Sequence, residues 1–167
     1  MKNIYNCFEN YTVIKIEGSN IHDVFELCKQ NKKYYEYLQE QATLDAVQNM
    51  LTELPPNTKL KDKYFLGFYQ NKSLVAILDI IDGYPVKGKA FIGLFMIDQA
   101  LQGKGIGKNI IKQLLSFLTS KNYASCELGV IDTNVEAQQF WTKLGFEKTG
   151  KTYTHEKYNV IMMSCKL

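Results

Sequence analysis

The stretch Gln102-Gly103-Lys104-Gly105-Ile106-Gly107-Lys108 joins a continuously apolar run, residues 90–97, to an amphipathic segment that begins at Ile106. Its three glycines allow a tight turn and leave backbone amides exposed and pointing the same way. The positive end of the following helix dipole lies behind those amides, and Lys104 and Lys108 add charge nearby. The sequence therefore predicts an anion site, suited to a pyrophosphate, between a buried strand and a helix.

Two familiar nucleotide motifs do not fit the spacing of this loop. A P-loop needs a glycine where Gln102 stands and a hydroxyl residue where Asn109 follows the lysine. A dinucleotide fingerprint needs a glycine in place of Lys108 and a parallel strand–helix–strand unit near the N-terminus. The pattern that remains is Gln-x-x-Gly-x-Gly, from Gln102 to Gly107. A purely structural turn and a phosphate- or nucleotide-binding module of another kind are the alternatives.

The segments on either side of the loop predict a mixed sheet in a single domain, residues 1–167. Apolar periodicity places helices at residues 21–27, at 34–54, from 106 to about 118, and in a short segment after 134. Strands are expected at 12–17, 64–69, 74–81, 90–97, 124–131, 146–150 and 157–166. The order β-α-α-β-β-β-α-β-α-β-β indicates an α/β fold of the α+β kind, with a mostly antiparallel central sheet and helices on both faces.

Composition excludes several classes of partner. The 20 basic and 17 acidic residues leave a net charge of +3, and the lysines are spread along the chain, which argues against a nucleic-acid groove. Four cysteines without a Cys-x-x-Cys pair and two histidines make a poor metal site. No leader pattern follows Met1 and no apolar run approaches a membrane span. We expect a cytoplasmic protein with reduced thiols, whose exposed final strands offer an edge for a homodimer.

A second motif lies nearer the C-terminus: Asn134-x-x-Ala137-x-x-Phe140-Trp141-x-x-x-Gly145-Phe146. Residues 133–136, Thr-Asn-Val-Glu, are typical of a capping box that opens a helix, and Gly145 is the usual residue at a helix end. Together the two motifs resemble those of the GCN5-related N-acetyltransferases, the GNAT superfamily. The resemblance is clearest over residues 90–148 and agrees with the order of elements along nearly the whole chain.

The resemblance implies an acetyl-CoA-dependent N-acetyltransferase that passes the acetyl group directly to a primary amine of a small molecule or peptide. The Phe95 amide would polarise the thioester carbonyl, Asn134 would contact the pantetheine, Trp141 would contact the thioester, and Lys143 would approach the nucleotide end. The pantetheine arm would add to the backbone of residues 95–97 like an extra strand. The implied acetyl-CoA site is Phe95, Met96, Ile97, Gln102, Gly103, Lys104, Gly105, Ile106, Gly107, Lys108, Asn134, Trp141 and Lys143.

Trp141 departs from the family pattern, in which a tyrosine at this position donates a proton to the leaving thiolate. An indole N–H donates a hydrogen bond but does not titrate near neutral pH. Two hypotheses follow. Either the thiolate leaves with the help of water or another tyrosine, or the protein is a non-catalytic domain that binds or senses acyl-CoA.

An amine must lose a proton before it attacks, so a base is needed as well. Asp79 interrupts an apolar strand, which predicts either a paired acid or a functional one. Asp82 and Tyr84 lie in the loop before the central strand and complete the catalytic candidates. The tyrosine cluster of residues 34–37 is predicted to serve packing rather than to form a substrate cage.

Overall fold

Seven strands form one mixed sheet in the computed structural model, which describes residues 1 and 3–167. Across the sheet the strands are ordered β1-β2-β3-β4-β5-β7-β6, and every neighbouring pair is antiparallel except β4 and β5. The strands are β1 (Thr12–Lys15), β2 (Lys63–Gln70), β3 (Ser73–Asp82), β4 (Lys89–Ile97), β5 (Ser125–Ile131), β6 (Glu147–Thr154) and β7 (Asn159–Lys166). The predicted mixed, mostly antiparallel sheet is confirmed.

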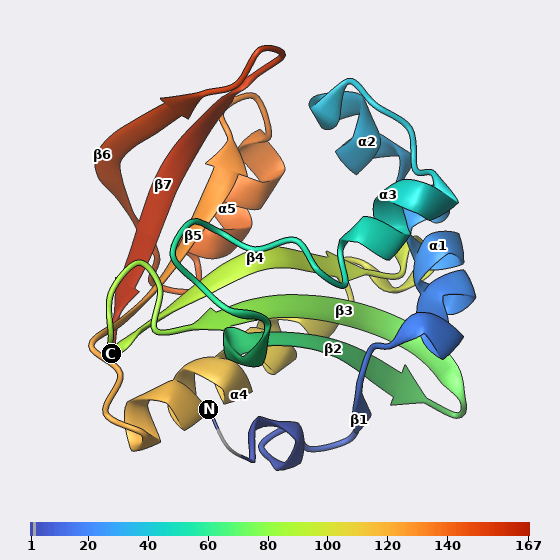
Figure 1. The fold of residues 1–167 in the computed structure, drawn as a ribbon, viewed down its shortest axis with the longest axis horizontal. Coiled ribbons are helices and arrows are strands. Elements are labelled where there is room, and N and C mark those ends of the chain that lie inside the picture. Colours follow the sequence, from blue (N-terminus) through green and yellow to red (C-terminus); the bar gives the residue numbers. More distant parts are fainter. Residues whose placement is uncertain (2) are drawn as a thin grey trace.

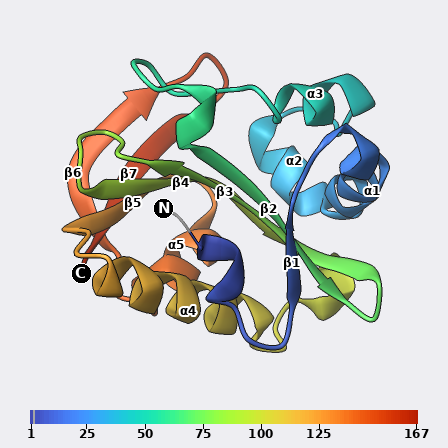
Figure 2. The same ribbon diagram turned by 60° about the horizontal axis from the view of Figure 1, so that its bottom comes forward.

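Helices cover both faces of this sheet (Figures 1 and 2). Buried residues such as Val24 and Val47 bring α1 and α3 against one face, and Ile110 and Leu114 bring α4 against the other. Each stripe follows the helical repeat, so burial of apolar surface fixes which side of each helix meets the strands. The helices are α1 (Ile21–Gln30), α2 (Lys32–Leu38), α3 (Leu44–Asn49), α4 (Ile106–Ser120) and α5 (Val135–Thr142).

The single helix expected over residues 34–54 is wrong, because two short helices occupy that segment. Gln39 ends α2 in a left-handed conformation (φ 54°), which an α-helix does not continue through. Thr43 then caps α3, its hydroxyl oxygen accepting the N–H of Ala46 at 3.1 Å. The helical spacing of the apolar residues continued across this break and concealed it.

The parallel pair β4–β5 separates part-way along its length. Its register runs from Lys89 opposite Ser125 to Ile92 opposite Leu128 and then stops. Just beyond that point the β3–β4 register shifts by one residue, which leaves Gly93 as the extra residue of a β-bulge. The last part of β4 is therefore paired with β3 on one side and open toward β5 on the other.

None of the helices within residues 1 and 3–167 is both long and apolar enough to cross a bilayer.

Candidate active site

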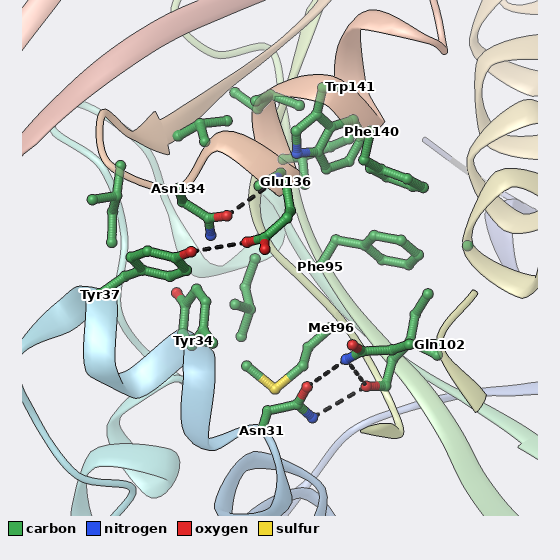
Figure 3. Close-up of a pocket in the computed structure, with 18 of the residues that line it drawn as sticks. Asn31, Tyr34, Tyr37, Phe95, Met96, Gln102, Asn134, Glu136, Phe140 and Trp141 are labelled. Carbon is green, nitrogen blue, oxygen red and sulfur yellow. Dashed lines mark hydrogen bonds between the residues drawn. The ribbon is translucent and has the colours of Figure 1, made fainter. Parts of the chain in front are cut away.

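A cavity of about 910 Å³ opens where β4 and β5 separate. Its wall is built from β4, β5, the loop before α4 with the first residues of that helix, the helices α2 and α5, and the start of β7. Most of the residues predicted to hold acetyl-CoA line it: Phe95, Met96, Ile97, Gln102, Gly103, Gly105, Ile106, Gly107, Lys108, Asn134 and Trp141. Figure 3 shows lining residues that come from elements far apart in the sequence and labels ten of them.

The pairing of β4 with β3 fixes which backbone groups face this opening. Asp98 donates its N–H to the Val75 carbonyl at 2.9 Å. Opposed residues of an antiparallel pair alternate between exchanging hydrogen bonds and turning both groups away. The register is regular over residues 94–97, so Phe95 and Ile97 direct their N–H and C=O groups away from β3, toward β5. The Phe95 amide thus faces the cavity with no strand partner.

The loop before α4 presents a second set of backbone donors. Gly103 (φ 75°) and Gly105 (φ 84°, the helix N-cap) adopt left-handed conformations that favour glycine. The first bond of the helix is the one donated by Asn109 to the Gly105 carbonyl, at 3.0 Å. The amides of residues 106–108 precede that bond and have no partner within the helix, so they are available to an anion.

A close approach between elements brings this helix end to the cavity. A Cβ on Gly107 would lie 2.5 Å from Ile97 Cδ1 and 3.3 Å from the Phe140 ring, so glycine lets α4 begin close to β4 and α5 without displacing these side chains. An amide network then ties the loop to the end of the strand. Asn31 Nδ2 and Gln102 Nε2 both donate to the Ile97 carbonyl, at 3.1 and 3.2 Å, and Gln102 Nε2 also donates to Asn31 Oδ1 at 2.7 Å.

Four aromatic rings pack together where β4 meets α5, and three of them, Phe95, Phe140 and Trp141, line the cavity. Trp141 is 7% exposed and its ring lies 5.0 Å from Phe140, 5.1 Å from Phe146 and 6.0 Å from Phe95. These contacts make Trp141 part of the core, while its presence in the cavity lining leaves one edge facing the opening. Packing and contact with a ligand are therefore compatible at this position.

Comparisons with known proteins identify the family. Residues 27–167 match the model of the family described as "Acetyltransferase (GNAT) domain". The chain belongs to this family.

Similar proteins agree with the GNAT assignment. The chain is 30% identical over 91 residues to a spermine/spermidine N(1)-acetyltransferase of Bacillus subtilis, a stretch that covers 53% of this chain and 59% of that protein. The chain therefore matches less than two thirds of that relative's length. An acetyltransferase structure from Thermus thermophilus superposes with a TM-score of 0.77 at 17% identity, covering 95% of this chain and 97% of the other. PaiA N-acetyltransferase of Thermoplasma acidophilum, solved with coenzyme A, gives 0.67 at 17% identity, covering 94% and 99%. These structures share the GNAT fold.

At the mouth of the cavity, α2 and the start of α5 are joined by polar contacts in this GNAT domain. Tyr37 donates its hydroxyl to Glu136 Oε2 at 2.8 Å, and Lys33 Nζ pairs with Glu136 Oε1 (Figure 3 shows the tyrosine contact). Hydrogen bonds from Lys33, the larger cause, and from Tyr37 lower the pKa of the Glu136 carboxyl.

The capping box predicted from Thr133 is wrong. Asn134 is the N-cap of α5, and its Oδ1 accepts the N–H of Ala137 at 3.0 Å.

The catalytic candidates do not line the cavity. Asp82 accepts hydrogen bonds from the N-terminal ammonium at 2.8 Å and from the Tyr123 hydroxyl at 2.7 Å. Tyr84 packs edge-on against Phe91 at 5.3 Å. Asp82 is the last residue of β3 and Tyr84 lies in the β3–β4 loop, and the contacts of both are made outside the cavity lining.

Two lysines of the predicted donor site also lie outside the cavity lining. Lys104 is exposed in the glycine loop, between two glycines that do line the cavity. Lys143 is exposed at the C-terminal end of α5. Among the described lysines, Lys108 and Lys33 are those that reach the wall.

Asp79 forms a buried ion pair on the α1–α3 side of the sheet. Its Oδ2 lies 2.7 Å from Lys63 Nζ, which also donates to the Glu53 carbonyl at 3.0 Å. Burial raises the pKa of the Asp79 carboxyl, and Lys63 opposes that rise. A Cβ on Gly93 would lie 2.9 Å from Asp79 Oδ2, so the bulge packs directly on this acid. The pair supports the strand that carries the site.

We expect Lys63→Met to lower the free energy of unfolding by about 3 kcal/mol near neutral pH, because it leaves an unpaired carboxylate in the core. Without the ammonium, the pKa of Asp79 rises further in the folded protein. A folded state that holds a proton more tightly loses stability as pH rises between the unfolded and folded pKa values. Urea unfolding should therefore show the smallest defect at about pH 4 and a larger one at about pH 7.

The double variant Lys63→Met, Asp79→Leu serves as the control, because it removes both charges. It should recover most of the lost stability. A single variant as stable as the wild type at neutral pH would show that the pair contributes nothing.

Sequence reasoning missed the residues at the mouth and the junction. Asn31 and Glu136 gave no signal, because their partners are distant in sequence, and Tyr158 lies in a turn without a motif. The tyrosines of residues 34–37 do not all have the packing role predicted for them. Tyr35 is buried in the α1–α3 core, as predicted for a packing residue, whereas Tyr34 and Tyr37 line the cavity.

Within the residues the structure describes, no group of three or more His, Cys, Asp or Glu side chains is placed to hold a metal ion.

Proposed function

We propose that this protein is an N-acetyltransferase that uses acetyl-CoA to acetylate a primary amine of a small molecule. The observation that carries the proposal is the convergence of two sets of free backbone donors on one cavity. The Phe95 amide faces the opening between β4 and β5, and the amides of residues 106–108 face it from the start of α4. A thioester oxygen and a pyrophosphate are the acceptors that suit these two positions.

The donor would lie along the open side of β4. The amides of residues 106–108, with the helix dipole and Lys108, would hold its pyrophosphate. The unpaired groups of Phe95 would meet the amide-bearing arm as an added strand does, with Asn134 on the opposite wall. Bound in this way, acetyl-CoA would supply an acetyl group activated as a thioester.

The chain's own groups would assist transfer by hydrogen bonding. The neutral amine forms a C–N bond to the acetyl carbon as the C–S bond breaks, and its proton passes to water at the open mouth. The Phe95 N–H would stabilise the negative charge that develops on the thioester oxygen. The thiolate is a tolerable leaving group, since a thiol has a pKa near 8.5, and it takes its proton from water at the same opening.

A second function has a specific observation in its favour. Trp141 occupies the position at which the family pattern has a proton-donating tyrosine, and it is packed as a core residue. A domain that binds acyl-CoA without transferring the group would have no need of that acid. The two functions share the donor site and differ only in turnover.

Donor binding is tested by thermal unfolding. Acetyl-CoA and free coenzyme A should each raise the melting temperature, since a ligand that binds only the folded state stabilises it by mass action. ATP at the same concentration should raise it less, because it lacks the pantetheine arm. An unchanged melting temperature with both coenzyme A forms would contradict the proposal, and tighter binding of ATP would favour a nucleotide-binding module instead.

A further inference from the structure

Asn31 joins α1 to α2 and is the N-cap of α2, but its side chain does not cap that helix. An asparagine at this position ordinarily accepts a hydrogen bond from the second or third amide of the helix that follows. Here the residue is 6% exposed, and a buried amide group needs hydrogen-bond partners. The side chain of Asn31 finds them in elements far from it in the sequence.

The side-chain amide of Asn31 connects three parts of the site. Its Nδ2 donates to the Leu27 carbonyl at 2.8 Å and to the Ile97 carbonyl at 3.1 Å. Its Oδ1 accepts from Gln102 Nε2 at 2.7 Å (Figure 3). Because a backbone carbonyl only accepts, the two carbonyls determine which way the Asn31 amide points, and that amide in turn orients Gln102. The end of α1, the end of β4 and the loop before α4 therefore meet at Asn31.

Gln102 is the first residue of the loop before α4, residues 102–105, and its side chain links that loop to the N-cap of α2. Two of the four loop residues are glycines, which leave the backbone more freedom than other residues do. A pyrophosphate bound to the amides of residues 106–108 would hold the loop in one conformation. The side chain of Gln102 would then be held as well.

The position of α2 depends on such contacts because the helix has only seven residues. Isolated helices shorter than about 12 residues are marginal in water, so a short one is stabilised by what it contacts. The Asn31 carbonyl accepts the N–H groups of Tyr34 and Tyr35, at 3.0 and 3.4 Å, and so begins the first turn. Tyr34 and Tyr37 of this helix line the cavity. A shift of Asn31 would therefore move this part of the cavity wall.

From this geometry we propose that Asn31 is a positioning residue that couples the donor site to α2. Pyrophosphate bound at the start of α4 holds Gln102, Gln102 holds Asn31, and Asn31 holds the first turn of α2 against the cavity. Coupling between two sites is reciprocal, so an acceptor that contacts α2 binds more tightly once the donor is bound. The inference rests on the proposed donor binding and adds to it the connection between the two parts of the site.

Hydrogen exchange in the presence of ADP tests this coupling, because ADP carries a pyrophosphate but no pantetheine arm to contact α2. In the wild type, saturating ADP should slow exchange at residues 106–108, which reports an occupied loop. It should also slow exchange of the α2 amides, residues 32–38, about fivefold, the factor that one net hydrogen bond supplies. Mass spectrometry of the two segments measures both effects in one sample.

Gln102→Met breaks the link from the side of the loop. It preserves the length of the side chain and leaves both bonds from Asn31 Nδ2 in place, so the variant should fold. With ADP bound, exchange should still slow at residues 106–108 but no longer in α2. Asn31→Ala should give the same result, with a lower melting temperature because two buried carbonyls lose a donor.

Gln39→Met is the matched control. Gln39 Nε2 donates to the Lys157 carbonyl at 2.7 Å, which ties the other end of α2 to the β6–β7 turn, and Gln39 does not line the cavity. Exchange in α2 should be faster in this variant without ADP and should keep the fivefold response to ADP. Loss of the response here as well would show that any loosening of α2 removes it, which would overturn the role of Asn31.

Two further outcomes separate the coupling from the donor site. An unchanged α2 in the wild type while residues 106–108 are protected, or a full α2 response in Gln102→Met, would overturn the coupling and leave the donor site intact. Failure of both ADP and coenzyme A to protect residues 106–108 would overturn the proposed donor site, and the coupling with it.

Discussion

Gly105→Asp is expected to abolish the rise in melting temperature that coenzyme A produces. Gly105 is the N-cap of α4 with φ 84°, a conformation that costs other residues roughly 1–2 kcal/mol. The new carboxylate would also stand beside the free amides of residues 106–108, where it repels a pyrophosphate and competes for the same donors. Loss of binding should therefore exceed any loss of stability.

Gly88→Asp separates these two effects. Gly88 has φ 85° and, like Gly105, open space where a Cβ would stand, but it lies in the β3–β4 loop and does not line the cavity. This variant should show a similar fall in the melting temperature of the free protein and a full response to coenzyme A. If Gly105→Asp responded to coenzyme A as Gly88→Asp does, the loop would not be the anion site.

Phe95→Pro is expected to lower kcat by roughly 10²–10³-fold, the loss seen when one donor to a developing oxyanion is removed. Proline deletes the Phe95 N–H and leaves the chain extended. Because this N–H faces the cavity and not β3, no bond of the sheet is lost, and proline is tolerated at such edge-like positions. Initial rates of coenzyme A release at saturating amine give kcat directly.

Phe95→Leu distinguishes the backbone from the ring. It retains the amide but loses the packing of the Phe95 ring on Phe140 and Trp141, whose centroids lie 6.2 and 6.0 Å away. We expect this variant to keep most of its kcat. Equal kcat values for the proline and leucine variants, both folded by circular dichroism, would show that the amide takes no part in transfer.

Local patterns explain why the sheet and the glycine loop could be predicted from sequence. Strand period, turn residues and the three glycines all act over a few neighbouring residues, so their consequences appear in the sequence itself. Gln39 itself does not indicate the break between the two helices, because glutamine rarely adopts a left-handed conformation. Thr43, a good N-cap followed by Asp45, was the signal for a new helix.

Long-range contacts explain why the rest of the site could not be predicted. Glu136 meets Lys33 and Tyr37 across 103 and 99 residues, and nothing in either local sequence indicates its partner. The interrupted apolar run at Asp79 did signal an unusual environment. The sequence does not show which residue lies beside Asp79. The pairing of β2 with β3 brings Lys63 next to it, and this ion pair favours a structural role for Asp79 over catalysis.

Release of the coenzyme A thiol, followed with a thiol reagent in the presence of acetyl-CoA and a panel of amines, tests the central claim most directly. The account predicts release that depends on both acetyl-CoA and a primary amine, together with an N-acetylated product detected by mass spectrometry. Acetyl-CoA binding without amine-dependent release for any amine of the panel would contradict it and would identify the protein as a binding domain.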